Sequence, residues 1–161
     1  MYDVIIYTDG SSSPADHSGG WAALLRKWPG GPEKVISGYE ANTTNQRMEL
    51  QAAIGGLAAL KRRRRLKVKV ISDSAYLVNC FHQGWMDNWK LNGWRTYRNK
   101  PVENRDLWEQ LESQVAHHDV EFEHVKGHAG HTLNERVDRL ASEARRLGVG
   151  QTTHTRDDHS E

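Results

Sequence analysis

Apolar residues gather in short runs along the chain, and polar segments separate them. Residues 4–7 form an apolar run that is typical of a buried strand, which is predicted over residues 3–9. The segments WAALLRKW and EKVISGYEA lie on either side of a Pro29–Pro32 turn, and they predict two further strands that would complete a three-stranded meander. Residues 66–73 and 120–125 predict two more strands.

The spacing of apolar residues between these strands predicts helices that connect them. Positions 50, 53, 54 and 57 are apolar and predict a helix over residues 43–61, with Thr43 and Gln46 as its capping box. Further helices are predicted over residues 75–83, 104–116 and 133–147. Helices between strands suit right-handed parallel crossovers. The order of elements therefore favours an α/β fold in which helices pack on a mixed sheet.

Length and composition fit one globular domain. The chain has 161 residues, of which 37% are hydrophobic and 27% are charged. We expect the domain to cover residues 1–147 and residues 148–161 to form a flexible tail. Nothing in the sequence requires a partner subunit, so we expect a monomer.

Simple patterns exclude several classes of protein. The first residues do not have a basic segment followed by a long apolar one, which a signal peptide needs. No apolar run approaches the roughly 20 residues of a membrane span, so no membrane partner is expected. The single cysteine, Cys80, excludes an internal disulfide and a Cys-rich zinc site. A cytoplasmic location is the expectation that follows.

The net charge of +1 hides an uneven distribution of charge. Residues 61–69 hold seven basic residues and no acidic one, whereas the segment 148–161 holds one basic and three acidic residues. The run Lys61–Arg65 suggests nucleic-acid contact. Its place at the carboxyl end of the predicted helix, about 18 Å along that helix from Glu49, favours a solvated face instead.

Two strands end in a carboxylate. The first predicted strand ends Thr8-Asp9-Gly10, and the run VKVISDS ends in the same way at Asp73. Asp-Gly is a common turn, and Asp73 could cap a helix that begins near Ser74. If the two strands are parallel neighbours, however, both carboxylates lie at the carboxyl edge of the sheet, where open α/β sheets bind ligands.

Two helical acids are expected to join them. Glu49 lies beside the apolar stripe of its helix, and Asp138 shares a helix face with Asn134. Each could instead be an ordinary solvated residue. Together, four converging carboxylates would repel one another strongly, and a divalent cation would resolve that repulsion. Oxygen ligands suit Mg²⁺ or Mn²⁺. Zinc is not favoured, because Cys and His residues do not cluster in the sequence as a zinc site requires.

Six segments occur in an order and spacing that resemble type 1 ribonuclease H of the bacterial kind: YTDGS, NTTNQRMEL, ISDSAYLVN, WKLNGWRT, KPVENRDLW and VKGHAGHTLNERVDRLA. The resemblance covers residues 3–147. It implies a five-stranded mixed sheet flanked by helices, and an endonuclease that degrades the RNA strand of RNA–DNA hybrids with divalent metal. The family's four carboxylates fall on Asp9, Glu49, Asp73 and Asp138, and its mobile histidine falls on His128.

The resemblance also implies a mechanism. Two Mg²⁺ ions, for which Mn²⁺ could substitute, would hold the scissile phosphate, with Asp9 as the bridging ligand. The products would carry 5′-phosphate and 3′-hydroxyl ends. His128 would handle a proton or assist product release, while His131 is assigned a structural role.

Candidate substrate contacts surround this site. Asn45 and Gln46 can both donate and accept hydrogen bonds, so they could contact the ribose 2′-hydroxyl, although helix capping is the alternative. Thr44 and Asn104 match positions that bind a phosphate of the DNA strand in some relatives. Residues 84–100 resemble a basic protrusion that binds nucleic acid, with contacts expected from Trp85, Trp89 and Lys90. Trp94 is expected in the core and Trp89 on the surface.

One departure and two rival functions remain open. Ala15 lies near the position of an RNA-contacting asparagine of relatives, so ribose recognition through the loop 11–20 is in doubt.

The first rival function is a nucleic-acid-binding module without catalysis, but such a module would not gather carboxylates near phosphates. A related metal nuclease that acts on DNA would keep the carboxylates, and substrate choice would separate it from a hybrid-specific enzyme.

Overall fold

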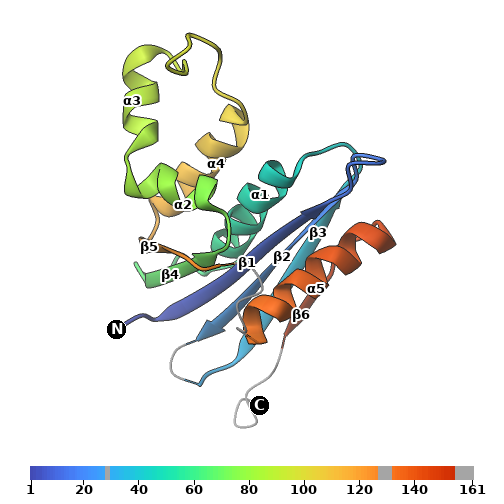
Figure 1. Cartoon of the computed structure of the whole chain (residues 1–161). Coiled ribbons are helices and arrows are strands. Elements are labelled where there is room, and N and C mark those ends of the chain that lie inside the picture. Colours follow the sequence, from blue (N-terminus) through green and yellow to red (C-terminus); the bar gives the residue numbers. More distant parts are fainter. Residues whose placement is uncertain (28–29, 127–131, 155–161) are drawn as a thin grey trace.

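The computed structural model describes residues 1–27, 30–126 and 132–154, and it folds around one mixed sheet (Figure 1). The strands are β1 (Val4–Ser12), β2 (Gly19–Lys27), β3 (Glu33–Glu40), β4 (Lys67–Ser72), β5 (Asp119–His124) and β6 (Thr152–His154). The helices are α1 (Asn45–Ala58), α2 (Ala75–His82), α3 (Trp85–Asn92), α4 (Arg105–Val115) and α5 (Thr132–Leu147). In these ranges, no helix has the length and apolar character needed to cross a membrane.

The sheet has six strands in the order β5-β4-β1-β2-β3-β6. The predicted meander is confirmed, because β1 pairs antiparallel with β2, and β2 with β3. β1 also pairs in parallel with β4, where Tyr7 lies opposite Ile71. Asp9 and Asp73 each follow two residues after this pair, so the register brings both to the same level at the carboxyl edge.

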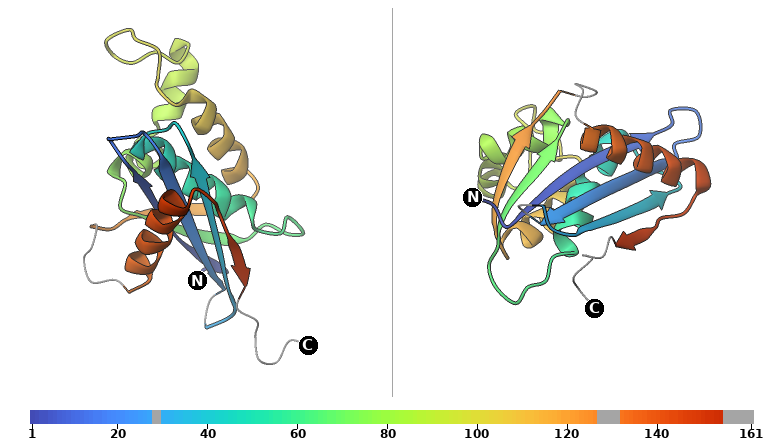
Figure 2. Two further views of the ribbon diagram at one scale, coloured as in Figure 1. Left: turned by 90° about the vertical axis from the view of Figure 1, so that its right-hand side faces the viewer. Right: turned by 90° about the horizontal axis from the view of Figure 1, so that it is seen from below.

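The helices form layers on both faces of the sheet (Figure 2). α5 covers one face, where Val137 and Ala141 pack against Ala22, Leu24 and Val35. The larger core lies on the other face, beneath α1, α2 and α4. Because α1 is enclosed by the sheet on one side and α4 on the other, residues outside the predicted apolar stripe, such as Met48 and Ala52, are also fully buried.

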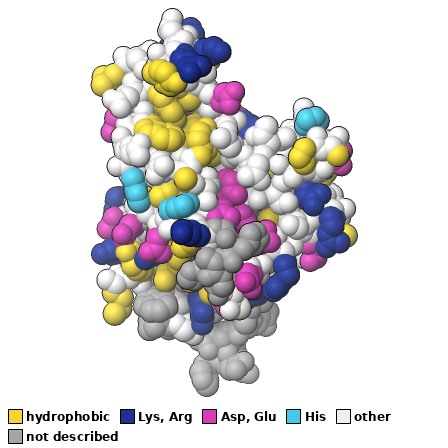
Figure 3. Space-filling model, in the orientation of Figure 1, with side chains coloured by type: hydrophobic (Ala, Val, Ile, Leu, Met, Phe, Trp, Pro, Cys, Tyr) yellow, Lys and Arg dark blue, Asp and Glu magenta, His cyan; other side chains and the backbone are white. Residues whose placement is uncertain are grey.

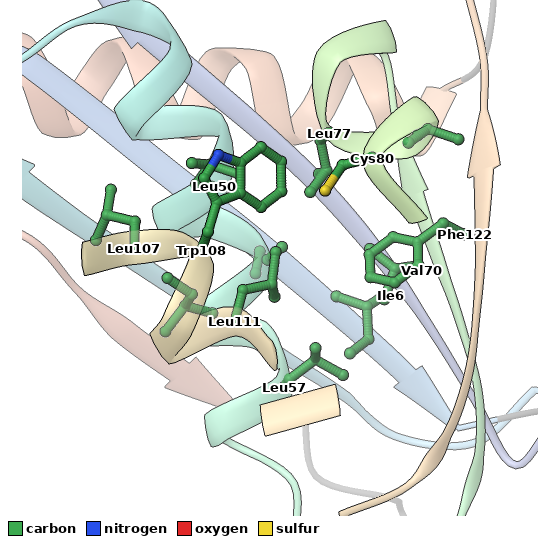
Figure 4. Packing of buried hydrophobic residues seen from close by; sticks show 14 of the residues in the cluster. Ile6, Leu50, Leu57, Val70, Leu77, Cys80, Leu107, Trp108, Leu111 and Phe122 are labelled. Carbon is green, nitrogen blue, oxygen red and sulfur yellow. The ribbon is translucent and has the colours of Figure 1, made fainter. Parts of the chain in front are cut away.

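Trp108 of α4 lies at the centre of this larger core (Figure 4). Its ring is fully buried, and its indole N–H donates a hydrogen bond of 3.0 Å to the hydroxyl of Tyr76. Leu50 and Leu111 are buried in the same cluster. A buried Trp needs a partner for its N–H, and the Tyr76 hydroxyl supplies it, which ties α4 to α2.

Both ends of α1 differ from the prediction. The helix begins at Asn45, and the hydroxyl of Thr44 rather than Thr43 accepts the capping hydrogen bond, from the Arg47 N–H at 3.2 Å. Thr43 is buried, and its N–H donates to the carbonyl of His17. The helix ends at Ala58, so the run Lys61–Arg65 lies in the exposed loop before β4 and not on the helix.

The sixth strand arises from the segment that is predicted to be a tail. Thr152, Thr153 and His154 pair antiparallel with Ile36, Val35 and Lys34 at the edge of β3. Three residues without an apolar pattern give no strand signal, and only the open edge of β3 makes the pairing possible. Residues 155–161 lie outside the described residues, and the boundary between domain and tail stays a prediction.

Candidate active site

Three carboxylates converge at the carboxyl edge of the sheet. Asp9 lies near the end of β1, Asp73 follows β4, and Glu49 lies in the second turn of α1. One carboxylate oxygen from each lies within 4.8 Å of the others. We call these three residues the carboxylate cluster. The register of β1 and β4 accounts for Asp9 and Asp73, whereas the packing of α1 against β1 brings in Glu49.

Asp138 approaches the carboxylate cluster from α5, on the opposite face of the sheet from α1. It lines an open cavity of about 310 Å³ together with Asp9, Glu49 and Asp73. It also shares a smaller pocket with Asn134, its neighbour one turn earlier on α5. The structure therefore brings together all four acids singled out in the sequence. Figure 3 shows acidic side chains grouped near the centre of the face that Figure 1 also presents to the viewer.

Glycine at position 10 makes the approach of Glu49 possible. A Cβ atom at Gly10 would lie 2.6 Å from the backbone nitrogen of Glu49 and 2.7 Å from the carbonyl carbon of Met48. Real contacts of this kind do not come closer than about 3 Å, so a side chain here would push α1 away from β1. The Gly10 N–H also donates a 2.9 Å hydrogen bond to the carboxylate of Asp9.

Burial and mutual repulsion disfavour the charged forms of these acids. Burial, followed by the negative charge of Asp73, raises the pKa of Asp9 to about 8. Burial, together with the charges of Asp9 and Asp73, raises the pKa of Glu49 well above its ordinary value. In the described part of the chain, the Oε2 atom of Glu49 is buried without a hydrogen-bond partner.

The donor set fits a hard divalent cation. Only carboxylate oxygens converge here, and such ligands suit Mg²⁺ or Mn²⁺ rather than zinc. A cation would neutralise the repulsion that raises both pKa values, and it would offer the orphaned Glu49 oxygen a partner. The structure thus supports a site for a divalent metal ion.

The first turn of α1 lies beside this site. Asn45 and Gln46 are exposed and line the same cavity as Glu49 and Asp73. Thr44 supplies the helix cap, so the side-chain amides of Asn45 and Gln46 are not needed for that role. The cap is thus assigned to Thr44, and Asn45 and Gln46 lie at the cavity.

Asn104 lies close to the start of α1 through a contact that sequence reasoning missed. Its Oδ1 accepts a hydrogen bond from Arg47 at 3.3 Å, and its Nδ2 lies 3.4 Å from the Tyr76 hydroxyl. Arg47 also binds both carboxylate oxygens of Asp106, at 3.0 and 2.8 Å. Arg47 thereby joins the start of α1 to the start of α4, which no local pattern reveals.

The tryptophan-rich segment forms α3 and the loop after it. Trp94 is buried, as predicted, but Trp89 is half-buried rather than on the surface, since its ring packs at 5.8 Å from that of Trp108 and 5.6 Å from that of Trp94. Trp85 is also half-buried, with its ring 6.0 Å from that of Trp89. Lys90 is exposed and forms an ion pair with Glu112.

Two further features complete the surroundings of the site. His124, which sequence reasoning did not single out, places its Nε2 atom 3.1 Å from the backbone carbonyl oxygen of Asp73. In the loop near Ala15, the carboxylate of Asp16 accepts hydrogen bonds from both the N–H and the hydroxyl of Ser18. The predicted histidine His128, and His131 with it, lie outside the described residues.

Comparison with known proteins agrees with this geometry. The family model described as RNase H matches residues 1–146. A ribonuclease H of Thermus thermophilus is 52% identical over 148 residues, which are 92% of this chain and 85% of the relative. A ribonuclease H of Hydrogenovibrio crunogenus is 51% identical over 144 residues, which are 89% of this chain and 96% of the relative.

Solved structures show the same fold. A type 1 RNase H with the type 2 active-site motif superposes with a TM-score of 0.82 and 29% identity, and the match covers 96% of this chain and 77% of the other. A foamy viral protease-reverse transcriptase, solved in complex with an RNA/DNA hybrid, matches with a TM-score of 0.76 and 20% identity, over 91% of this chain and 20% of the viral chain. On the family model and these close relatives, the chain belongs to the RNase H family and is a ribonuclease H enzyme.

Proposed function

We propose that this enzyme is an endonuclease that hydrolyses the RNA strand of RNA–DNA hybrids by two-metal-ion catalysis. The observation that supports it most directly is the carboxylate cluster, in which three carboxylates, two of them buried, lie within 4.8 Å at the carboxyl edge of the sheet. The relatives named above are ribonucleases H, and one structural neighbour was solved with an RNA/DNA hybrid.

Asp9, Glu49, Asp73 and Asp138 would hold the cations. Asp9 would be the central ligand, because its strand β1 pairs with β4, which precedes Asp73, and both α1 and α5 pack against β1. When bound, divalent cations in such a site activate a water for attack on a phosphodiester and neutralise charge on the leaving oxygen. Mg²⁺ is the proposed metal and Mn²⁺ a substitute. All four ligands come from one chain, which supports action as a monomer.

The chain's own residues would orient the substrate. Asn45 and Gln46 line the cavity beside Glu49, and their amides would donate to and accept from a ribose 2′-hydroxyl. Thr44 and Asn104, which both accept a hydrogen bond from Arg47, would bind a phosphate of the DNA strand. Half-buried Trp85 and Trp89 with Lys90 would contact the hybrid along α3.

His128 is proposed to take or give a proton, or to assist product release, after the substrate is bound. His128→Ala should therefore lower kcat and leave the Kd for a hybrid unchanged, whereas exposed His117→Ala should change neither. An equal weakening of hybrid binding by His128→Ala would argue against a role in turnover.

Cleavage of one labelled RNA tests the proposal. The RNA would be supplied paired with DNA, single-stranded and paired with RNA, each with Mg²⁺ and with a chelator. Metal-dependent cutting of only the DNA-paired RNA is expected. Asp9→Asn should abolish it, while Asp119→Asn, the same chemical change at an exposed position at the start of β5, should not.

The products separate the finer claims. A 3′-hydroxyl end can be extended by a poly(A) polymerase, and a 5′-phosphate prevents labelling by a kinase until a phosphatase removes it, so both ends are checked directly. Cutting of duplex DNA would favour the DNA nuclease alternative, and tight hybrid binding without cutting would favour a binding module.

A further inference from the structure

A second concave site lies at the end of the sheet remote from the carboxylate cluster. It is a cleft of about 710 Å³, and its walls come from the start of β1, the end of β2, the start of β3 and the loop that follows α1. Asp9 lies towards the other end of β1. Nothing in the proposed catalytic function uses this cleft.

The cleft is strongly basic around an apolar floor. The floor includes Leu25, Leu60 and Leu66, and we call the whole site the basic cleft. Its cationic side chains are Lys27, Lys34, Lys61, Arg63 and Arg64. An arrangement of this kind attracts a negatively charged partner.

The two acidic residues of the basic cleft, Asp3 and Glu33, are fewer than its five cations, and only Asp3 forms an ion pair with one of them. Asp3 binds Arg64 at 3.6 Å and the Lys67 N–H at 2.8 Å, and Glu33 binds Arg136 at 2.8 Å. For the remaining cations of the cleft, the described ranges hold no ion pair with another side chain of those ranges. The basic cleft therefore has an excess of positive charge that the described residues leave uncompensated.

β6 directs the chain to this cleft. It runs antiparallel to β3 at the edge of the sheet (Figure 2). Its last residue, His154, pairs with Lys34, which itself lines the cleft. Residues 155–161 follow immediately, with the sequence TRDDHSE. Seven residues reach about 23 Å when extended, so the segment starts beside one wall of the cleft with length to cross it.

We propose that the acidic segment 155–161 docks in the basic cleft, with Asp157, Asp158 and Glu161 against its cations. The opposite charges and the register of β6 support this occupant. Because the segment is tethered at Lys34, its effective concentration at the cleft is in the millimolar range or above, which favours it over a free competitor. Docking would cover a basic surface far from the carboxylate cluster and so limit unproductive binding of nucleic acid there.

Zero-length cross-linking of the full chain tests the placement. A carbodiimide joins a carboxylate to an amine only when they are in contact, and peptide mass spectrometry identifies the pair. We expect cross-links from Asp157 or Asp158 to Lys34, Lys61 or Lys27, and their loss at high salt. Cross-links from these acids to lysines outside the cleft, such as Lys90 or Lys100, would overturn the proposal, as would none at low salt.

A double-mutant cycle tests the consequence. Binding of a labelled single-stranded oligodeoxynucleotide would be measured by anisotropy in chelator at low salt, for a tail variant (Asp157→Asn, Asp158→Asn, Glu161→Gln) and a cleft variant (Lys61→Gln, Arg63→Gln, Arg64→Gln). The tail variant should bind at least about threefold more tightly than the unmodified chain, and this gain should vanish in the cleft variant.

A charge-matched control uses exposed acids away from the cleft, Asp87→Asn, Glu103→Gln and Glu109→Gln. Its effect on oligonucleotide binding should be the same with and without the cleft substitutions. If the tail variant also acts equally in both backgrounds, the segment changes only the total charge, and docking in the basic cleft is wrong. The readouts need no nuclease activity, so they are independent of the proposed catalytic function.

Discussion

A Cβ atom on Gly10 would lie 2.6 Å from the backbone nitrogen of Glu49, so glycine at position 10 sets how closely α1 can approach the end of β1. Gly10→Ala should move α1 outward and separate Glu49 from Asp9. We expect a loss of about 1–3 kcal/mol in the free energy of unfolding and at least a tenfold loss of cleavage rate. Urea unfolding and hybrid cleavage measure the two effects.

Gly30→Ala is the matched control for this change. Gly30 has φ +65°, and a Cβ atom there would meet no other atom within 4 Å, so alanine at this position is strained only by its backbone. It should cost about 1 kcal/mol of stability and leave cleavage unchanged. If Gly10→Ala cleaved at the normal rate, the close contact between β1 and α1 would not set the geometry of the carboxylate cluster.

Neutralising Asp9 should stabilise the metal-free protein while abolishing activity. Its pKa, raised to about 8 by burial and by Asp73, means that the folded state binds a proton more tightly than the unfolded state. Stability therefore falls as the pH rises from about 4 towards 8. Asp9→Asn removes this cost, and a gain on the order of a few kcal/mol is expected at pH 8, with a smaller gain at pH 5.

Urea unfolding in chelator at both pH values measures this gain. Added Mg²⁺ should stabilise the unmodified protein and leave Asp9→Asn nearly unaffected, because binding to the folded state alone raises stability. Asp119→Asn, at an exposed position, should show neither effect. A metal-free Asp9→Asn protein that is less stable at pH 8 than the unmodified chain would contradict the repulsion inferred for the carboxylate cluster.

Arg47 should matter for both stability and substrate binding. It binds Asp106 through two hydrogen bonds and also holds Asn104, so it fixes the start of α4 relative to α1. In a double-mutant cycle, Arg47→Ala and Asp106→Asn should couple by about 1 kcal/mol, more than the exposed pair Arg105 and Glu109. Arg47→Ala should also raise KM for a hybrid more than it lowers kcat.

The sequence was sufficient to place Asp9 and Asp73 because each follows an apolar run, and parallel pairing of β1 and β4 puts both at one edge, although β1 continues beyond Asp9 to Ser12. Glu49 was recognisable as a candidate, but its burial was not, because it depends on α1 being covered by both the sheet and α4. The cap at Thr44 instead of Thr43 shows the same limit, since Thr43 is recruited by a distant backbone group at His17.

Features that depend on long-range contacts escaped prediction for a common reason. The half-burial of Trp89 follows from the position of Trp108 on another helix. The hydrogen bond from His124 to the carbonyl of Asp73 joins residues 51 positions apart. β6 exists because β3 offers an open edge to Thr152–His154, and no periodicity within three residues could indicate that partner.

His118 should make stability depend on pH below neutrality. It is buried, the Leu66 N–H donates to its Nδ1 at 3.2 Å, and burial, with the nearby charges of His117 and Arg65, lowers its pKa below the ordinary value of 6.5. The folded state thus binds its proton less tightly than the unfolded state, so stability holds above pH 6.5 and falls as the pH drops below it.

His118→Asn should flatten this dependence of stability on pH, because an amide oxygen can accept the hydrogen bond from the Leu66 N–H without gaining a proton. Urea unfolding between about pH 7.5 and pH 5, roughly the titration range of histidine, measures the effect. His117→Asn, at the exposed neighbour, should keep the slope of the unmodified protein. An unchanged slope in His118→Asn would assign the acid sensitivity to other groups.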